Sequence, residues 1–131
     1  MKILDSDHCV AILRGLLDLE GRLAPDEALG VTTISLGELA HEAHKSQRAA
    51  ENLARLDVLL SALNVLSYDE SAARLFSQLK ARLEREGKRI PDLDLQIASI
   101  ALASGLPLVA HNQRHFAPLV DLAGLSLDDL L

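Results

Sequence analysis

Short runs rich in apolar and β-branched residues alternate with longer stretches of helical periodicity from one end of the chain to the other. Runs of this kind, bounded by polar or turn-forming residues, predict strands. The expected strands cover residues 3–4, 29–34, 64–67 and 106–110, with a final edge strand at residues 119–120 or at Leu125.

Between these runs, apolar residues recur at spacings of three and four, which predicts amphipathic helices. The expected helices begin at Asp7 and cover residues 35–44, 47–63, 69–86 and 94–104. The helix over residues 69–86 has the clearest apolar stripe. The helix over residues 94–104 is apolar on most sides, so we expect it to be central.

Strand and helix alternate without repeats or a linker, which predicts a single α/β domain over residues 1–131 with a mostly parallel sheet. Ligands of such sheets collect at the carboxyl ends of the strands. Asp5, Glu38 and residues 111–112 all lie just past predicted strand ends. These segments are therefore expected to meet at one edge of the sheet.

Composition narrows the class of protein. Of 131 residues, 49% are apolar and 24% are charged, which indicates a globular chain, and aromatic residues reach only 2%, which leaves few platforms for stacking bases. The net charge of −6 disfavours a protein held to nucleic acid by charge alone. It agrees better with an acidic pocket that cations neutralise, or with a basic partner protein.

The single cysteine, Cys9, excludes an intrachain disulfide and fits a reducing cytosol. It lies in an apolar helical stretch, so we expect it to pack in the core. No apolar run approaches the roughly 20 residues needed to span a bilayer, and no signal peptide is visible. We therefore expect a soluble, cytoplasmic protein.

Acidic residues stand where a fold would turn them inward. Asp5 ends an apolar strand, and Asp94 opens the apolar helix over residues 94–104. Carboxylates in such places are costly unless they are protonated, paired or bound to a cation. Mg²⁺ and Mn²⁺ take oxygen ligands and keep several waters, so two or three carboxylates suffice. The pattern therefore predicts a divalent metal site and chemistry on phosphates.

Some of these acids also have a structural interpretation. Asp7 fits an N-cap of the first helix, and one of Asp92 and Asp94 fits a cap of the central helix. Ser35 and Glu38 match the S-x-x-E capping box, although a glutamate in the first turn can also face the cleft.

Histidines and basic residues offer two further interpretations. Glu38, His41 and His44 recur every three residues, and His111 and His115 are four apart, but these spacings are loose for zinc, so we expect solvent-facing histidines. The basic run over residues 80–89 is interleaved with acids, which indicates a solvated helix face. A phosphate-contacting strip beside Asp94 is the alternative.

Four segments, in order and at normal spacing, resemble the motifs of one family. Residues 4–8 (LDSDH) resemble an opening LDTN or LDTD, and residues 35–39 (SLGEL) resemble a second motif with an acid in an ELxxG-like context. Residues 90–99 (IPDLDLQIAS) resemble DLxIAA, and residues 108–116 (LVAHNQRHF) resemble LVTxNxxxF. By these motifs the chain is identified as a member of the PIN-domain ribonucleases, specifically the VapC-type toxins of toxin–antitoxin pairs.

The resemblance implies a PIN-like α/β/α sandwich. Asp5 and Asp94 would be the principal Mg²⁺ ligands, with Mn²⁺ as an alternative ion, and Glu38 would be the third acid. Asn112 stands where many members have a fourth Asp, which leaves a second metal site open. The candidate RNA contacts are Ser6, Lys88, Arg89 and Arg114.

The resemblance also implies metal-dependent hydrolysis of RNA by an activated water. Members are typically dimers inhibited by a cognate antitoxin, whose basic C-terminal segment lies over the acidic cleft. We therefore expect an RNA substrate, an antitoxin partner, and either a homodimer or a toxin–antitoxin hetero-oligomer.

Two other functions are open. Asp5, Ser6 and Asp7 fit the D-x-D opening of haloacid-dehalogenase-like phosphatases, with Asp5 as nucleophile and Asp7 as acid/base, although Lys88 matches poorly and no cap domain fits. A catalytically inactive PIN-like module that binds RNA or protein is the second, because Asn112 removes the fourth acid.

Overall fold

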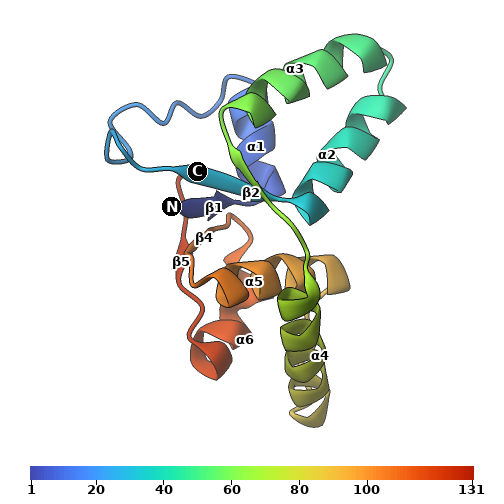
Figure 1. Cartoon of the computed structure of the whole chain (residues 1–131), viewed down its shortest axis with the longest axis vertical. Coiled ribbons are helices and arrows are strands. Elements are labelled where there is room, and N and C mark those ends of the chain that lie inside the picture. Colours follow the sequence, from blue (N-terminus) through green and yellow to red (C-terminus); the bar gives the residue numbers. More distant parts are fainter.

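Five short strands form one sheet at the centre of the structure, a computed structural model that describes residues 1–131 (Figure 1). The strands are β1 (Lys2–Leu4), β2 (Leu29–Thr32), β3 (Asn64–Leu66), β4 (Leu108–Val109) and β5 (Leu127–Asp128). The helices are α1 (Ser6–Leu13), α2 (Thr33–Lys45), α3 (Ala49–Ser61), α4 (Glu70–Arg85), α5 (Asp92–Ser104) and α6 (Gln113–Ala123). None of the helices is long and apolar enough to cross a membrane.

The strand order is β3-β2-β1-β4-β5, and every neighbouring pair is parallel. The central strand β1 pairs through Ile3 with Gly30 on one side and with Leu108 on the other. The carboxyl ends of parallel strands point to the same edge, so the segments that follow β1, β2 and β4 converge there. The predicted parallel α/β sheet is confirmed.

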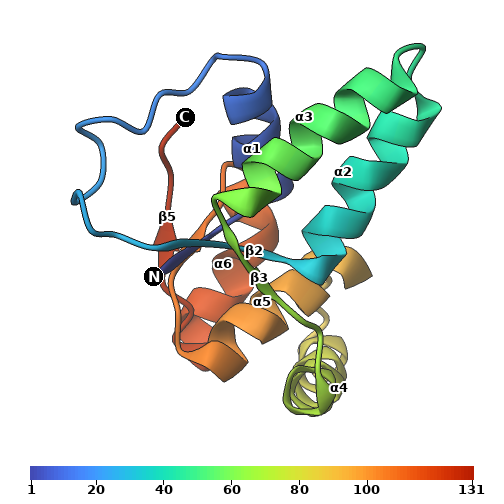
Figure 2. The same cartoon turned by 45° about the horizontal axis from the view of Figure 1, so that its top comes forward.

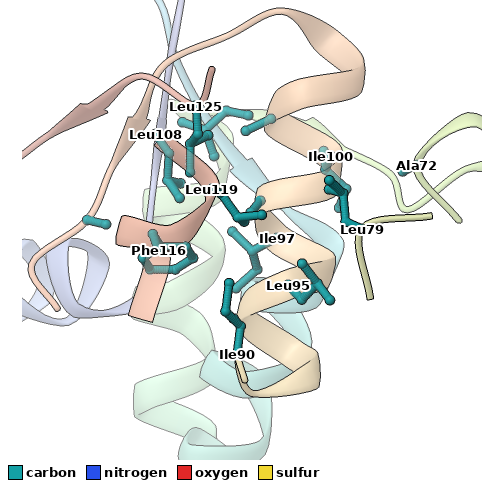
Figure 3. Packing of buried hydrophobic residues seen from close by; sticks show 14 of the residues in the cluster. Ala72, Leu79, Ile90, Leu95, Ile97, Ile100, Leu108, Phe116, Leu119 and Leu125 are labelled. Carbon is teal, nitrogen blue, oxygen red and sulfur yellow. The ribbon is translucent and has the colours of Figure 1, made fainter. Parts of the chain in front are cut away.

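Helices cover both faces of this sheet (Figures 1 and 2). One face carries α1, α2 and α3 over a buried cluster that includes Leu4, Val31 and Leu56. The other face carries α4, α5 and α6 over a larger cluster. In Figure 3, Leu95, Ile97 and Ile100 of the central helix α5 lie in this second cluster, between α4 and α6. The expected α/β/α sandwich and the central position of α5 are confirmed.

The first two helices begin earlier than predicted, because different residues cap them. Asp5 is the N-cap of α1 and accepts a hydrogen bond from the His8 backbone N–H at 2.9 Å, so the prediction that Asp7 caps this helix is wrong. Thr32 caps α2 through the Ser35 N–H at 3.1 Å. The strand predicted over residues 29–34 therefore ends at Thr32, and the capping box of Ser35 and Glu38 does not form.

The central helix also begins earlier than predicted, at Asp92. Its N-cap is Pro91, and no side chain bonds the free backbone N–H groups there. The prediction that Asp92 or Asp94 caps this helix is therefore wrong, and both acids lie in its first turn.

The C-terminal strand prediction is also wrong. Residues 119–120 belong to helix α6, and the last strand is β5, after Leu125. Phe116 and Leu119, three residues apart, form the buried face of α6 (Figure 3). Pro118 inside this helix obscured the pattern, because proline normally ends a helix.

Cys9 is fully buried in α1, which confirms that it packs in the core. Burial raises the pKa of its thiol to about 12, with a smaller contribution from the charge of Asp5. The thiolate is the reactive form of cysteine, so this residue is chemically inert at neutral pH.

Candidate metal centre

A pocket of about 170 Å³ opens at the carboxyl edge of the sheet. Its walls come from four segments that are far apart in the sequence and are joined by the parallel topology. The lining residues are Asp5, Ser6, Asp7, Glu38, Asp94, Ile97, Asn112, His115 and Phe116. All of the acids singled out as metal-ligand candidates therefore lie around one cavity.

The Asp5 side chain is fixed in place by hydrogen bonds to both of its oxygens. Its side chain accepts three hydrogen bonds while remaining only 7% exposed. Oδ1 contacts the His8 backbone N at 2.9 Å and the His8 Nδ1 at 2.7 Å, and Oδ2 accepts from the His111 N–H at 3.0 Å. Asp5 therefore ties the start of α1 to the chain leaving β4, and it faces the pocket as well.

Glu38 enters the pocket from the second turn of α2. The Ser6 hydroxyl donates a hydrogen bond to its Oε1 at 3.1 Å. Burial raises the pKa of Glu38, and the negative charges of Asp94, Asp7 and Asp5 raise it further, while the Ser6 hydrogen bond acts in the opposite direction. The carboxylates around this pocket therefore repel one another, which is the electrostatic situation that a bound cation relieves.

Asp94 lies in the first turn of α5 and contacts the Nδ1 of His115 through Oδ2 at 2.6 Å. The Asn112 side-chain nitrogen lies 3.2 Å from the other ring nitrogen of His115. His115 was expected to face solvent, and its side chain is 42% exposed, but it also lines the pocket, which was not predicted. Its position three residues into the motif that resembles NxxxF is the signal that could have identified it.

The donor set suits a hard divalent cation. The acidic side chains offer carboxylate oxygens, Asn112 can add an amide oxygen, and no Lys or Arg lines the pocket. In this structure no three of these side chains lie close enough together to bind one ion, and Asp94 is turned towards His115. His41 and His44 are exposed and do not line this pocket, so the structure does not support zinc ligation by them with Glu38.

The basic residues proposed as RNA contacts lie outside the acidic pocket. Lys88 and Arg89 line a separate cavity of about 570 Å³ between the end of α4 and the start of α5. In this cavity Lys80 pairs with Asp92 at 2.9 Å. Arg114 lines another hollow, along the exposed side of α6. Of the four candidates, only Ser6 reaches the acids.

The raised pKa of Glu38 has a consequence for the stability of the metal-free protein. Its folded pKa lies above the unfolded value near 4.5, so the stability it contributes at low pH is lost as the pH rises through the folded pKa. We expect Glu38→Gln to raise the Tm at neutral pH in the presence of a chelator, and to leave it unchanged well below pH 4.5. Thermal unfolding at the two pH values measures both effects.

Glu42→Gln is the matched control, since Glu42 is exposed on the same helix and lies 3.3 Å from Lys45. It should bring no gain in Tm at either pH. A lower Tm for Glu38→Gln at neutral pH would contradict the electrostatic account of the pocket.

Comparison with known proteins identifies the family. The model of the PIN domain matches residues 2–120. Ribonuclease VapC2 of Haemophilus influenzae is 37% identical over 92 residues, which cover 70% of each chain. A tRNA(fMet)-specific endonuclease VapC of Shigella flexneri is 37% identical over 86 residues, which cover 66% of this chain and 65% of that one.

Solved structures agree in fold over nearly the full length. The DNA-bound VapBC of Salmonella typhimurium contains a chain that is 30% identical, with a TM-score of 0.89 over 100% of both chains. The DNA-bound VapBC2 of Rickettsia felis contains one that is 27% identical, with a TM-score of 0.87 over 98% of this chain and 97% of that one. The chain belongs to the PIN-domain family, among the VapC ribonucleases.

Proposed function

We propose that the protein is an endoribonuclease toxin that hydrolyses RNA phosphodiester bonds with Mg²⁺, or Mn²⁺, held by Asp5, Glu38 and Asp94. The observation that carries the proposal is that these acids line one pocket, and that no Lys or Arg lines it. The pKa of Glu38, raised first by burial and further by the charges of neighbouring acids, supports it, because a bound cation would offset both effects. Membership of the VapC ribonucleases supports the reaction.

A divalent cation in this pocket would lower the pKa of a bound water and stabilise negative charge on the phosphate oxygens. Asp5 and Asp94 would hold the ion from two different parts of the fold, the residue that follows β1 and the first turn of α5. Glu38 would help to hold the ion or to orient the attacking water through Oε2, the oxygen that Ser6 does not bond.

Anomalous scattering from crystals soaked in Mn²⁺ tests where the ion binds. We expect a peak inside the pocket, within coordination distance of Asp5 and Asp94, and no such peak in crystals of an Asp94→Asn variant. Full occupancy at another position, with the pocket empty, would contradict the proposal.

The phosphatase alternative is not favoured. Both oxygens of Asp5 already accept hydrogen bonds, from His8 and from the His111 backbone, which reduces the nucleophilicity of the carboxylate. The chain also matches the PIN family along most of its length. An inactive PIN-like module is not favoured either, because the three acids are all present at the pocket. Failure of the purified chain to cleave any RNA with Mg²⁺ or Mn²⁺ would favour the inactive module.

The cavity between α4 and α5 is the proposed path of the RNA backbone towards the acids. Its basic residues Lys88 and Arg89 adjoin the first turn of α5, which also carries Asp94. We expect the double variant Lys88→Ala/Arg89→Ala to weaken RNA binding and to flatten the plot of log affinity against log salt by about 0.7 for each phosphate that is no longer neutralised. Fluorescence anisotropy over a series of salt concentrations measures this slope.

Arg48→Ala is the control for that experiment. Arg48 is exposed in the turn between α2 and α3, at the tip remote from α5 in Figure 1. It should leave both the affinity and the slope unchanged. Equal losses of affinity in the two variants would indicate a diffuse effect of net charge, which would contradict the proposed RNA path.

We also propose a cognate antitoxin whose basic C-terminal segment covers the acidic pocket. Two of the most similar solved structures are VapBC complexes, which supports a protein partner. The net charge of −6 and the unneutralised acids support a basic partner segment. The assembled state would be a homodimer or a hetero-oligomer with this partner, and mass measurement of the co-expressed complex distinguishes them.

A further inference from the structure

We propose that His8 is a positioning residue for Asp5, and that the chain following β5 selects the His8 tautomer that performs this role. The inference rests on the proposed function, because Asp5 matters to the chemistry only as a ligand of the cation. It assigns a task to a side chain that does not line the pocket and does not belong to the acidic set.

His8 is the third residue of α1, and it is fully buried. A buried imidazole needs a hydrogen-bond partner at each ring nitrogen, because an unpaired polar atom in the core is costly. Both nitrogens of His8 have one. Nδ1 lies 2.7 Å from Asp5 Oδ1, and Nε2 lies 3.0 Å from the backbone N of Leu130.

The Leu130 contact determines which nitrogen carries the hydrogen. A backbone N–H can only donate, so Nε2 must be the acceptor and carries no hydrogen. In the neutral ring the hydrogen is then on Nδ1, which donates to Asp5. The Asp129 Oδ1 also lies 3.3 Å from this Nε2, but the Leu130 N is closer, at 3.0 Å, and it is the shorter contact from which we infer the tautomer.

The His8 bond also decides which oxygen of Asp5 is available. Each carboxylate oxygen has two lone pairs. Oδ1 receives two donors, the backbone N–H and the Nδ1–H of His8, whereas Oδ2 receives only the His111 N–H. The remaining acceptor capacity is therefore on Oδ2, and Asp5 would bind a cation through that single oxygen.

The residues after β5 are held firmly enough to impose this arrangement. Ala110 N–H donates to the Asp128 carbonyl at 2.8 Å, and Arg22 donates to the Leu130 carbonyl at 2.8 Å. The Lys2 ammonium pairs with the Asp128 carboxylate at 2.7 Å. This segment leaves the sheet beside β4 and runs towards α1 (Figure 2). A contact far from Asp5 in sequence thus reaches the candidate metal centre through one imidazole.

Mn²⁺ affinity, measured by calorimetry or by the EPR signal of the free ion, tests the role of His8 without relying on catalysis. We expect His8→Leu to weaken Mn²⁺ binding by about 10–100-fold, the usual range for loss of a partner that orients a metal ligand. His8→Asn should restore most of the affinity, because its amide nitrogen can donate to Asp5 in the place of Nδ1. Cys9→Ala is the control, since Cys9 is equally buried in the same helix and its side chain bonds neither carboxylate oxygen of Asp5.

Long-range ¹H–¹⁵N spectra of the wild-type protein provide a second readout, taken on the native fold. We expect one histidine with a protonated Nδ1 and a bare Nε2, assigned by its absence from the spectrum of His8→Asn. A hydrogen on Nε2 would overturn the inference, as would unchanged Mn²⁺ affinity in folded His8→Leu. If the wild-type protein itself binds no Mn²⁺, the proposed function fails first, which distinguishes the two failures.

Discussion

Replacement of Asp94 by Asn is expected to lower the rate of RNA cleavage by at least about 100-fold to 1,000-fold, the loss typical for one preorganised electrostatic group. The substitution keeps the shape of the side chain and removes the charge that holds the cation. It should change stability little, because Asp94 is partly exposed, so its contact with His115 and its interaction with the helix dipole are each worth at most about 1 kcal/mol. Single-turnover cleavage of a labelled RNA and thermal unfolding measure the two effects.

Asp92→Asn is the matched control for this experiment. Asp92 lies two residues away in the same helical turn, but it is exposed and pairs with Lys80 in the neighbouring cavity. At saturating RNA, where a change in binding along that cavity does not limit the rate, it should retain cleavage close to the wild-type rate. Equal losses of activity in the two variants would show that any negative charge at the start of α5 has this effect, which would contradict a specific role for Asp94.

Asp5→Asn is expected to lower the rate of RNA cleavage as much as Asp94→Asn does, and also to destabilise the protein. An asparagine has one carbonyl oxygen, whereas Asp5 accepts bonds at both oxygens from His8 and the His111 backbone. The amide NH₂ would therefore face a donor in a buried place, at a cost of about 1–3 kcal/mol. Urea unfolding should show a lower midpoint, in contrast to Asp94→Asn.

Asp7→Asn separates this account from the phosphatase alternative. Asp7 is exposed in the first turn of α1 and caps nothing, so the variant should fold normally and largely retain ribonuclease activity. A phosphatase that uses Asp7 as its acid/base would lose turnover. Loss of activity on phosphate monoesters, with no activity on RNA in the wild-type protein, would favour the alternative.

The sequence predicted the architecture because the strands and helices of this chain have clear apolar patterns. Strand β1 was predicted from its apolar run alone. For helix α4, the apolar spacing and the capping residue Asp69 indicate the same start. Helix α6 was missed because Pro118 interrupts it and its buried face is short. Strand β5 covers only two residues, and no periodicity can be detected over that length.

The acids of the site were predictable from their positions, but their hydrogen bonds were not. Asp7 was predicted to cap the first helix, but the chain enters the helix at Asp5, and the Asp5 side chain takes that role. His8 and His115 were missed for a related reason. His115 reaches Asp94 across the pocket from α6, and His8, although only three residues from Asp5, is oriented by Leu130 at the other end of the chain.

The dependence of RNA cleavage on added divalent cation tests the central claim most directly. The purified protein, freed of any bound partner and stripped of metal with a chelator, is incubated with labelled RNA at increasing Mg²⁺. We expect no cleavage above background without the cation and a saturable rate once it is added, for the wild-type protein and Asp92→Asn but not for Asp94→Asn. Cleavage at an undiminished rate in chelator, by the wild-type protein and Asp94→Asn alike, would contradict the claim.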